Sequence, residues 1–374
     1  MKILELSPFS AGICGVWTRV LGEAERLAKN HEVHVFSSNI ERGTGKNKIV
    51  KPYEVINKVK ITRFPAKASF GQNTFFWGFT EEALKLKPDI IITHAYRQYY
   101  STKALKIAKR LGVPCFLVTH APFLDKKLRN WKLNSAVFLY DKLIGKRILN
   151  QYTKIIAITK WEIPYLLNLG CKKDKIIYIP NGIPEEFFKQ KKEKEQNKIL
   201  FLGRIAPIKD IETLIKAFSL MVDKKIKLEI VGPAEKDYLN ELKALSTRLN
   251  LKQRIIFSKP IYDLKEKIKK IDSARIFVLS SKREGMPQSL IEAMARQKIV
   301  VSSKSDGGKE IINGGQNGYL FTIGNAQELA EKIDISLSRN QKEIKKEAKK
   351  SVEQFSWDKL IKKIENYILN DVKV

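Results

Sequence analysis

The sequence contains few cysteines and no long apolar run. Its three cysteines, Cys14, Cys115 and Cys171, form no CxxC pair, so neither a disulfide framework nor a zinc site is indicated and a reducing compartment is expected. Glu5 and Pro8 interrupt the N-terminal apolar segment, and no later run reaches the ~18 apolar residues that a membrane span needs. We therefore expect a cytoplasmic protein whose only membrane contact is peripheral, on the inner face.

Several signatures of nucleotide and metal chemistry are missing as well. The chain has no GxGxxG dinucleotide fingerprint, no P-loop and no HExxH motif. It also has no Asp-x-Asp, the usual pair of carboxylates that seats a divalent ion beside a nucleotide diphosphate. We therefore expect no metal site and no cofactor, so a bound diphosphate would need cationic side chains as its counter-charge.

Acidic residues are scarce relative to basic ones. The chain has 70 lysines and arginines against 40 aspartates and glutamates, a formal net charge of +30. This excess predicts a polyanionic partner, namely nucleic acid, an anionic membrane surface or a phosphorylated ligand, although genomic bias toward lysine is an alternative origin. The hydrophobic content of 43% is that of a globular protein, and 374 residues predict about two domains.

The first half of the chain begins like a Rossmann-like unit. A strand over Lys2–Leu6 leads into the glycine-bearing loop SAGICG, a helix over about 17–29 and the alternating strand HEVHVFSS. Gly12 and Gly15 would let the backbone approach a ligand closely, and a simple tight turn is the alternative explanation.

Two later strands, in PDIIITHA and VPCFLVTHAP, each end in a Thr-His pair at His94 and His120. Histidines at strand ends lie on the edge of an α/β sheet where ligands bind. A hydrogen-bonded structural imidazole is the alternative for each, and His31 and His34 are expected to be structural.

Residues 125–154 are basic and carry interleaved aromatic residues. A basic helix with aromatics is a candidate membrane-surface element, and a solvated helix with an ordinary core-facing stripe is the alternative. The basic residues are Lys126, Lys127, Arg129, Lys132, Lys142, Lys146, Arg147 and Lys154, and the aromatic residues are Trp131, Phe138 and Tyr140.

A second series of strands and helices follows the charged stretch KKEKEQNK (191–198), which is typical of a linker. Strand, loop and helix recur in ILFLGRIAPIKDIETLIKAFSL and in KLEIVGPAEKDYLNEL. The two halves predict an α/β protein of two Rossmann-like domains facing each other across a cleft. Arg204 and Lys209, between a strand and a helix, are well placed to bind a diphosphate, although either residue alone is more often a surface charge.

The stretch Ile276–Val301 predicts a strand, a loop and a helix that together carry two carboxylates. Pro287 suits the first turn of a helix, so Glu292 should lie in the second turn and Glu284 in the preceding loop. Both carboxylates would then face one cleft at the carboxyl end of a strand. The alternative is an exposed loop acid and a glutamate on a solvated helix face.

Taken together, these motifs resemble the family-4 (group 1) retaining glycosyltransferases of the GT-B fold. The resemblance is carried by GRIAPIK, EGMPQSLIEAMA with its Glu-x7-Glu pair, SKSDGGKEII, NGYLF and the closing FSWDKLIKKIENYI. It is strongest from about Lys198 to the end. It implies an acceptor-side domain over 1–185, a donor domain over 195–354, and a C-terminal helix within 355–374 that crosses back onto the first domain.

The resemblance also implies roles for individual residues. Two cations would bind the donor diphosphate, two glutamates would bind the ribose and the transferred sugar, and a histidine would touch the sugar or its leaving phosphate. The implied catalytic residues are Glu284, His120, Arg204 and Lys209, and the implied donor-binding residues are Gly15, Arg204, Lys209, Glu284, Gly285, Met286, Pro287 and Glu292.

The implied activity is transfer of a hexose, with retention and without a metal, from a UDP or GDP sugar to a glycan or lipid-linked acceptor. The chain departs from the family at Phe257-Ser258-Lys259, where Phe-x-Gly is usual near the nucleobase, and at Met286-Pro287, where many relatives carry a second glycine. Two alternatives are a GT-B sugar-nucleotide epimerase and a non-catalytic basic protein that binds nucleic acid or membrane. No nucleic-acid-binding motif is visible, so no nucleic-acid partner is expected.

Overall fold

The computed structural model of the protein describes residues 1–12, 14–41, 48–70, 73–76, 78–123, 131–190, 193–338 and 341–372. The chain divides into two compact units. The first combines the chain up to residue 182 with the C-terminal segment from residue 357, and the second spans 183–356. The division therefore falls ahead of the charged stretch 191–198, where a linker was expected, and Lys198 is already the first, buried residue of a strand.

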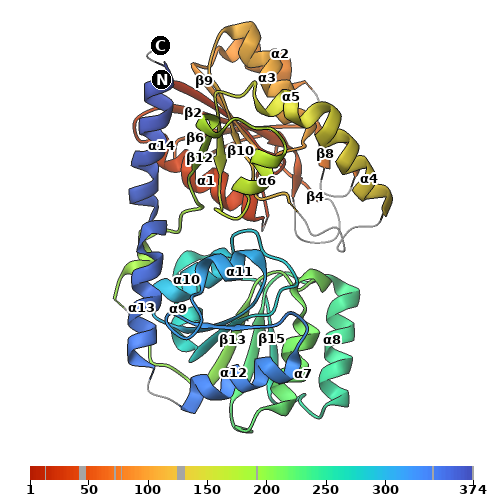
Figure 1. Ribbon diagram of the computed structural model, residues 1–374, viewed down its shortest axis with the longest axis vertical. Helices are drawn as coiled ribbons and strands as arrows, with labels where there is room; N and C mark the ends of the chain where they lie inside the picture. The colour runs from red at the N-terminus through yellow and green to blue at the C-terminus, as the bar shows by residue number, and fades with distance from the viewer. Residues whose placement is uncertain are drawn as a thin grey trace. The chain divides into compact units, whose positions relative to one another are not determined.

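The first unit is built on an eight-stranded sheet with the order β12-β11-β10-β9-β1-β2-β6-β5 (Figure 1). All neighbouring pairs are parallel except β5 and β6. The strand order reverses direction at β1, between β9 and β2, which is the kind of switch point where α/β sheets bind ligands. The strands are β1 (Lys2–Leu6), β2 (Glu32–Ser38), β5 (Tyr53–Ile56), β6 (Val59–Phe64), β9 (Ile90–His94), β10 (Cys115–Val118), β11 (Lys154–Ala157) and β12 (Ile176–Tyr178).

Helices cover this sheet through regular apolar faces. In α1 (Gly15–Leu27) the buried positions Trp17, Val20, Ala24 and Leu27 recur every three or four residues, as an amphipathic helix requires. The helix begins two residues earlier than the predicted start at 17. The other helices include α2 (Phe79–Leu86), α3 (Tyr99–Leu111), α6 (Ile163–Asn168), and the continuous run of α4 (Trp131–Tyr140), a π-helical turn (Asp141–Gly145) and α5 (Lys146–Leu149).

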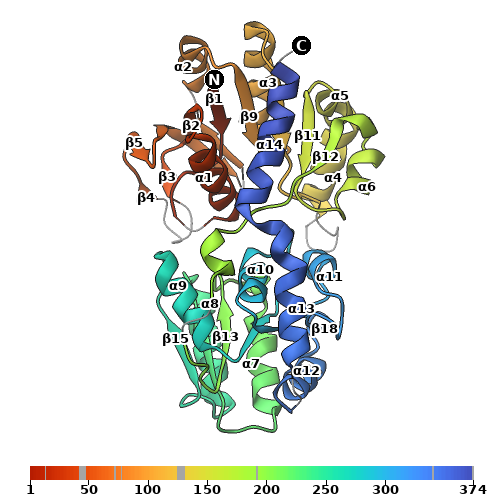
Figure 2. The same cartoon turned by 90° about the vertical axis from the view of Figure 1, so that its left-hand side faces the viewer.

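The C-terminal helix α14 (Trp357–Val372) belongs to the first unit, where it packs on α1 (Figure 2). Its first residue, Trp357, is buried, with the guanidinium groups of Arg19 and Arg26 at 5.2 and 5.4 Å from its ring centroid. A Cβ atom at Gly22 would lie 2.7 Å from this indole, and one at Gly182 would lie 2.3 Å from it. The two glycines therefore make the space that Trp357 fills.

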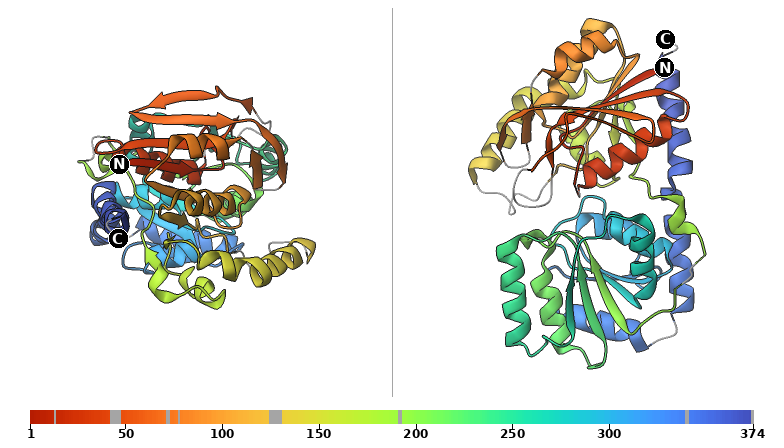
Figure 3. Two further views of the ribbon diagram at one scale, coloured as in Figure 1. Left: turned by 90° about the horizontal axis from the view of Figure 1, so that it is seen from above. Right: turned by 180° about the vertical axis from the view of Figure 1, so that it is seen from behind.

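The second unit is built on a six-stranded parallel sheet with the order β15-β14-β13-β16-β17-β18. Here the order reverses direction at β13, between β14 and β16. Among its helices, α7 (Ile211–Leu220) packs against α8 (Lys236–Arg248) and α12 (Ala326–Ser338), and α10 (Gln288–Ala295) packs against α13 (Lys342–Val352) (Figures 1 and 3). The strands are β13 (Lys198–Leu202), β14 (Lys227–Val231), β15 (Ile255–Ser258), β16 (Ile276–Leu279), β17 (Ile299–Ser303) and β18 (Tyr319–Phe321).

The helices of the second unit begin where side chains or backbone geometry allow. The Asp263 side chain accepts a hydrogen bond from the Glu266 amide at the start of α9, and the Ser305 side chain accepts one from the Gly308 amide at the start of α11. Pro287 was predicted in the first turn of α10 but lies just before it, because its ψ of 89° is not helical. The helices are α7 (Ile211–Leu220), α8 (Lys236–Arg248), α9 (Leu264–Ser273), α10 (Gln288–Ala295), α11 (Asp306–Ile311), α12 (Ala326–Ser338) and α13 (Lys342–Val352).

Candidate functional site

Lys209 and Glu284 meet at the switch point of the second sheet. Lys209 ends a short 3₁₀ helix after β13, and Glu284 lies in the loop after β16, the strand that pairs with β13. Lys209 Nζ lies 2.6 Å from Glu284 Oε1, and the Ser281 hydroxyl donates to the same oxygen at 2.6 Å. Both charged side chains keep part of their surface exposed. The pair is therefore fixed in position yet accessible to a ligand.

Backbone contacts hold the loop of Glu284 against the first turn of α11. The Gly307 amide donates to the Glu284 carbonyl at 3.1 Å. A Cβ atom at Gly307 would lie 2.4 Å from the Gly285 carbonyl oxygen and 2.9 Å from Pro287 Cδ. Only glycine fits this approach, which explains the glycine in the SKSDGGKEII motif. These contacts consequently fix the loop 284–287 in position.

Arg204 and Glu292 have separate partners in the same unit. Arg204 is half-exposed, and its Nη1 lies 3.5 Å from Glu235 Oε1. Glu292 is buried on α10, and Lys267 Nζ of α9 lies 2.6 Å from its carboxylate. Burial raises the pKa of Glu292, and Lys267 opposes that shift. The structure therefore brings Lys209 and Glu284 into contact, but it gives Arg204 and Glu292 different neighbours.

The predicted residues of the first unit lie at its own switch point. Gly15 is the first residue of α1, and a Cβ atom there would meet nothing within 4 Å, so the backbone at this point is open to a ligand. His120 follows β10 and is half-buried. Its backbone φ of 58° is one that residues other than glycine rarely adopt. Its Nε2 lies 3.1 Å from Nδ1 of His94, which is fully buried. The two histidines are thus one cluster.

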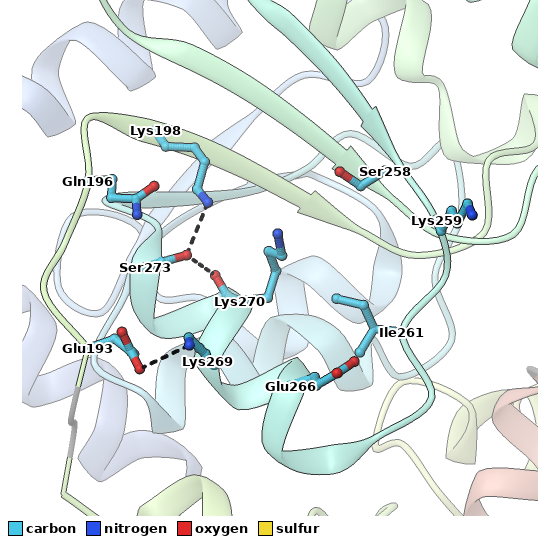
Figure 4. Close-up of a pocket in the computed structure, with 10 residues that line it drawn as sticks. All are labelled: Glu193, Gln196, Lys198, Ser258, Lys259, Ile261, Glu266, Lys269, Lys270 and Ser273. Atoms are coloured by element: carbon cyan, nitrogen blue, oxygen red, sulfur yellow. Dashed lines mark hydrogen bonds and ion pairs between the residues drawn. The ribbon is translucent and has the colours of Figure 1, made fainter.

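A separate polar cavity of about 470 Å³ lies between α9 and the strands β13 and β15 (Figure 4). Its ammonium groups at Lys198 and Lys270 lie 2.8 and 2.7 Å from the Glu229 carboxylate. Although burial opposes the charge, hydrogen bonds from these lysines and from Ser258 bring the pKa of Glu229 down to about 2. The cavity is lined by Glu193, Gln196, Lys198, Ser258, Lys259, Ile261, Glu266, Lys269, Lys270 and Ser273, and so includes two of the unusual positions 257–259 but none of the predicted site residues.

The cysteines and acidic residues form no metal centre among the described residues. Cys14, Cys115 and Cys171 are buried thiols. Within the part of the chain that the structure describes, no three histidine, cysteine, aspartate or glutamate side chains come together as metal ligands. No helix among those residues is both long enough and apolar enough to cross a membrane.

Three positions at these sites were not predicted from the sequence. Lys267 is one of several lysines on α9, and nothing in its local pattern indicates that it reaches Glu292. Ser281 could have been proposed from its spacing of three residues from Glu284. Glu5 Oε2 lies 3.0 Å from His94 Nε2. Its signal in the sequence is the interruption of the apolar pattern of β1, since a charged residue in a buried strand needs a partner.

Comparison with known families covers both units. Residues 182–370 match the model of glycosyl transferases group 1, and residues 13–187 match that of glycosyltransferase family 4. Two uncharacterised glycosyltransferases of Methanocaldococcus jannaschii are 28% and 32% identical to this chain, each over 92% of it and 91% of the relative. The capsular polysaccharide biosynthesis glycosyltransferase CapM of Staphylococcus aureus is 25% identical over 84% of this chain and 82% of its own.

Solved structures share the fold at low sequence identity. Anabaena HepE in complex with UDP matches with a TM-score of 0.79 at 19% identity, over 99% of this chain and 100% of its own. Sucrose-phosphate synthase from Thermosynechococcus elongatus matches with a TM-score of 0.76 at 18% identity, over 99% and 98%. Both predictions, of the fold and of the family, are confirmed: the chain belongs to the group 1 glycosyltransferases of family 4 and has the GT-B fold.

Proposed function

We propose that this glycosyltransferase transfers a hexose, with retention and without a metal, from a nucleotide-diphosphate sugar to a glycan or lipid-linked acceptor. The observation that carries the proposal is the Lys209–Glu284 pair, a cation and a carboxylate held 2.6 Å apart at the switch point of the second sheet. A sugar diphosphate needs both kinds of group. Its hydroxyls donate hydrogen bonds to a carboxylate, and its phosphates accept them from cations.

Charge development on the leaving group explains why cations belong here. Breaking the bond between the sugar and the diphosphate leaves additional negative charge on the phosphate oxygens. Preorganised cations stabilise that charge in the transition state, and we assign this role to Arg204 and Lys209. Glu284 would accept hydrogen bonds from the transferred sugar, and Gly285, Met286 and Pro287 would form the rest of its loop.

The remaining candidate residues have narrower roles in the proposal. Glu292 would accept hydrogen bonds from the ribose hydroxyls, with Lys267 favouring the ionised form of its carboxyl. In the first unit, the Gly15 backbone would approach the diphosphate, and His120 would contact the sugar or its leaving phosphate.

The names of related proteins support a nucleotide sugar and a glycan acceptor. HepE is described in complexes with UDP and with UDP-glucose. A GDP-Man:Man(3)GlcNAc(2)-PP-Dol alpha-1,2-mannosyltransferase of Xenopus laevis is 25% identical over 80% of this chain and 69% of its own. CapM is named for capsular polysaccharide biosynthesis. These names span UDP and GDP donors, so the assay must include both.

The first experiment is a donor panel. The protein is incubated with UDP and GDP hexoses, alone and with glycan and lipid extracts, and products are identified by mass spectrometry. We expect acceptor-dependent release of UDP or GDP that persists in EDTA. Loss of turnover in EDTA with recovery on adding magnesium or manganese would contradict metal independence, and conversion of the donor to its epimer without acceptor would indicate an epimerase.

The second experiment tests the diphosphate contacts. Lys209→Ala and Arg204→Ala should each weaken binding of the nucleoside diphosphate by about 1.5–3 kcal/mol per lost charged hydrogen bond, which is roughly 10- to 150-fold. Binding of the matching nucleoside should change little. Lys216→Ala, an exposed lysine on α7, serves as the control. Equal losses for the nucleoside and the diphosphate would remove these residues from the proposed role.

We also propose that the first unit docks on an anionic membrane surface through the helical run 131–149. Trp131 and Phe138 are 73% and 63% exposed, and their spacing of seven residues places them on one face of α4. Tyr140 instead packs toward the unit, with its ring centroid 6.2 Å from that of Tyr96. In Figure 3 α4 extends beyond the sheet of its own unit. The predicted cations Lys126, Lys127 and Arg129 lie outside the described residues.

A further inference from the structure

A buried carboxyl group and two imidazoles form a continuous hydrogen-bonded chain in the first unit. Glu5 Oε2 lies 3.0 Å from His94 Nε2, and His94 Nδ1 lies 3.1 Å from His120 Nε2. Glu5 and His94 are fully buried, whereas His120 is half-buried. The three residues come from β1, β9 and the end of β10, which are neighbours in the sheet at its switch point. This hydrogen-bonded chain therefore leads from the core of the unit to the edge of its sheet, where a ligand would bind.

The backbone at the open end of this chain is held in an unusual conformation. His120 and Ala121 have φ values of 58° and 47°, in the left-handed region that non-glycine residues seldom occupy. Such residues concentrate at functional sites, where the surrounding structure fixes them. Because Nε2 of His120 already faces His94, Nδ1 is the ring nitrogen left for a ligand.

Hydrogen bonding allows two proton arrangements along the chain. If Glu5 is ionised, His94 donates from Nε2 to Glu5, His120 donates from Nε2 to His94, and Nδ1 of His120 is a bare acceptor. If Glu5 is protonated, it donates to His94 Nε2, His94 donates from Nδ1 to His120 Nε2, and Nδ1 of His120 carries a proton. The second arrangement holds one proton more, and every group in it is neutral.

The surroundings of Glu5 favour the neutral arrangement. Among the described residues Glu5 Oε1 has no hydrogen-bond partner, which is far more costly for a buried carboxylate than for a neutral acid. On α1, the cation that acts on Glu5, Arg19, is already paired, because its Nε lies 2.7 Å from Glu23 Oε2. The Tyr100 hydroxyl of α3 donates its hydrogen bond to the backbone carbonyl of His94 and not to the imidazole ring of His94.

The directions of the pKa shifts agree with this arrangement. Burial and then Glu23 raise the pKa of Glu5 well above its usual value, against an opposing effect of Arg19. Burial, His120 and Arg19 lower the pKa of His94 well below its usual value. Burial and Arg19 also lower the pKa of His120, to about 3. These shifts all favour the uncharged forms of the three groups.

We propose that Glu5 and His94 are positioning residues that hold His120 as a neutral imidazole with its proton on Nδ1, as a fixed hydrogen-bond donor to the ligand. The identity of that ligand as a nucleotide sugar rests on the proposed function. A protonated imidazole would instead present a cation to the ligand. The chain of contacts assigns His120 a different task, the orientation of one oxygen of the sugar or phosphate.

The state of the rings can be measured without any substrate. The protein has four histidines in all. The variant His31→Gln/His34→Gln, labelled with ¹⁵N-histidine, therefore leaves only the signals of His94 and His120. We expect both rings to carry the proton on Nδ1 between pH 6 and 8. Protonation on Nε2 in both rings, or an imidazolium signal, would overturn the proposal. This result is independent of the proposed activity.

Two variants at one position then test the positioning role. Glu5→Gln can still donate to His94 Nε2, so it should keep the Nδ1 tautomers, whereas Glu5→Leu cannot donate and should yield mixed tautomers. Glu162→Gln alters another buried carboxyl group of the same unit and should leave both tautomers unchanged. If Glu5→Leu does not fold, the measurement on the otherwise unaltered protein still decides the tautomer.

Turnover separates this inference from the proposed function. With whichever UDP or GDP hexose the donor panel identifies, Glu5→Leu should lower kcat about two-fold or more, in proportion to the share of His120 rings that lose the Nδ1 proton. UDP and GDP affinities should fall less than kcat, and Glu5→Gln should recover kcat. If the unaltered protein shows the Nδ1 tautomer but Glu5→Leu keeps an unaltered kcat, Glu5 has no positioning role. Absence of turnover with every donor, beside the expected tautomers, would count against the proposed function alone.

Discussion

The two glutamates of the Glu-x7-Glu pair are held by different lysines, and this predicts separable effects. Glu284 is partly exposed beside Lys209, whereas Glu292 is buried beside Lys267. Glu284→Gln should lower turnover more than nucleotide affinity, because its proposed partner is the transferred sugar. Glu292→Gln should weaken binding of the nucleoside diphosphate itself, by about 1.5–3 kcal/mol for a lost charged hydrogen bond.

Steady-state kinetics and calorimetry with the same nucleotide measure both effects. Glu241→Gln, an exposed glutamate on α8, is the matched control. If both variants retained the kinetics and nucleotide affinity of the unaltered protein, Glu284 and Glu292 would be ordinary surface and helix charges. The Glu-x7-Glu motif would then have no role in donor binding.

Glu162 predicts a pH dependence of stability. Burial raises its pKa to about 7, despite hydrogen bonds from Thr119, Thr159 and Ile158 that act in the other direction. A raised pKa means that the folded protein binds this proton more tightly than the unfolded chain does. The resulting stabilisation is complete below the unfolded value of about 4.5 and is lost as the pH rises through 7, a change of about 2 kcal/mol between pH 5 and 8.

Chemical denaturation at pH 5 and pH 8 tests this prediction. In Glu162→Gln the side chain is neutral at both pH values, so the difference between the two free energies of unfolding should be about 2 kcal/mol smaller than in the unaltered protein. Comparing the two proteins cancels the contribution of other titrating groups such as Glu5. Equal slopes in the two proteins would show that Glu162 does not titrate in this range.

At the scale of elements, the contact between α1 and α14 should reverse the usual effect on stability of a glycine-to-alanine substitution in a helix. Replacing a glycine inside a helix by alanine usually stabilises it by ~1 kcal/mol. Gly22→Ala should instead destabilise the first unit by about 1–3 kcal/mol, because the new Cβ atom would lie 2.7 Å from the buried Trp357 indole. Thermal and denaturant unfolding measure the change.

A double-mutant cycle identifies the cause. In a Trp357→Ala background the clash is absent, so Gly22→Ala should become neutral or stabilising there. Gly314→Ala, where a Cβ atom would meet nothing within 4 Å, is the control for a tolerated glycine. A destabilisation by Gly22→Ala that persists without the indole would mean that α14 does not set the requirement for glycine in α1.

At the scale of the whole molecule, the net charge of +30 and the exposed aromatics of α4 predict binding to anionic vesicles. Each cation near such a surface contributes ~1 kcal/mol, and binding should weaken with salt. Changing Lys126, Lys127, Arg129 and Lys132 to Glu should abolish sedimentation with the vesicles. The double variant Trp131→Ala/Phe138→Ala should also weaken vesicle binding. Because this loss is apolar, it should be the same at low and at moderate salt.

Tyr53→Ala provides a matched control, since Tyr53 is an exposed aromatic residue of the same unit on the edge strand β5. Equal binding to neutral and anionic vesicles, or unaltered binding by the charge variant, would leave a soluble acceptor as the better proposal. The helical run 131–149 would then be a solvated element with no membrane role.

The sequence by itself determined the regular elements and the family, because both are local properties. Apolar runs such as Ile276–Leu279 specify buried strands, and helical spacing in QSLIEAMA specifies α10. The motif around Glu284 and Glu292 likewise depends on neighbours within a dozen residues. Even so, the start of α10 was placed one residue too early, since the backbone angles of Pro287 depend on its packing.

Only the tertiary structure decided which charged groups share a site. Lys209 and Glu284 are 75 residues apart, and Glu5 and His94 are 89 apart. A side chain's partner across a parallel sheet depends on strand order and register, which no periodicity encodes. The same holds for protonation, because burial and distant charges fix the state of Glu5 and His120. The physical reason is that electrostatic energy depends on distance in space, whereas sequence patterns record distance along the chain.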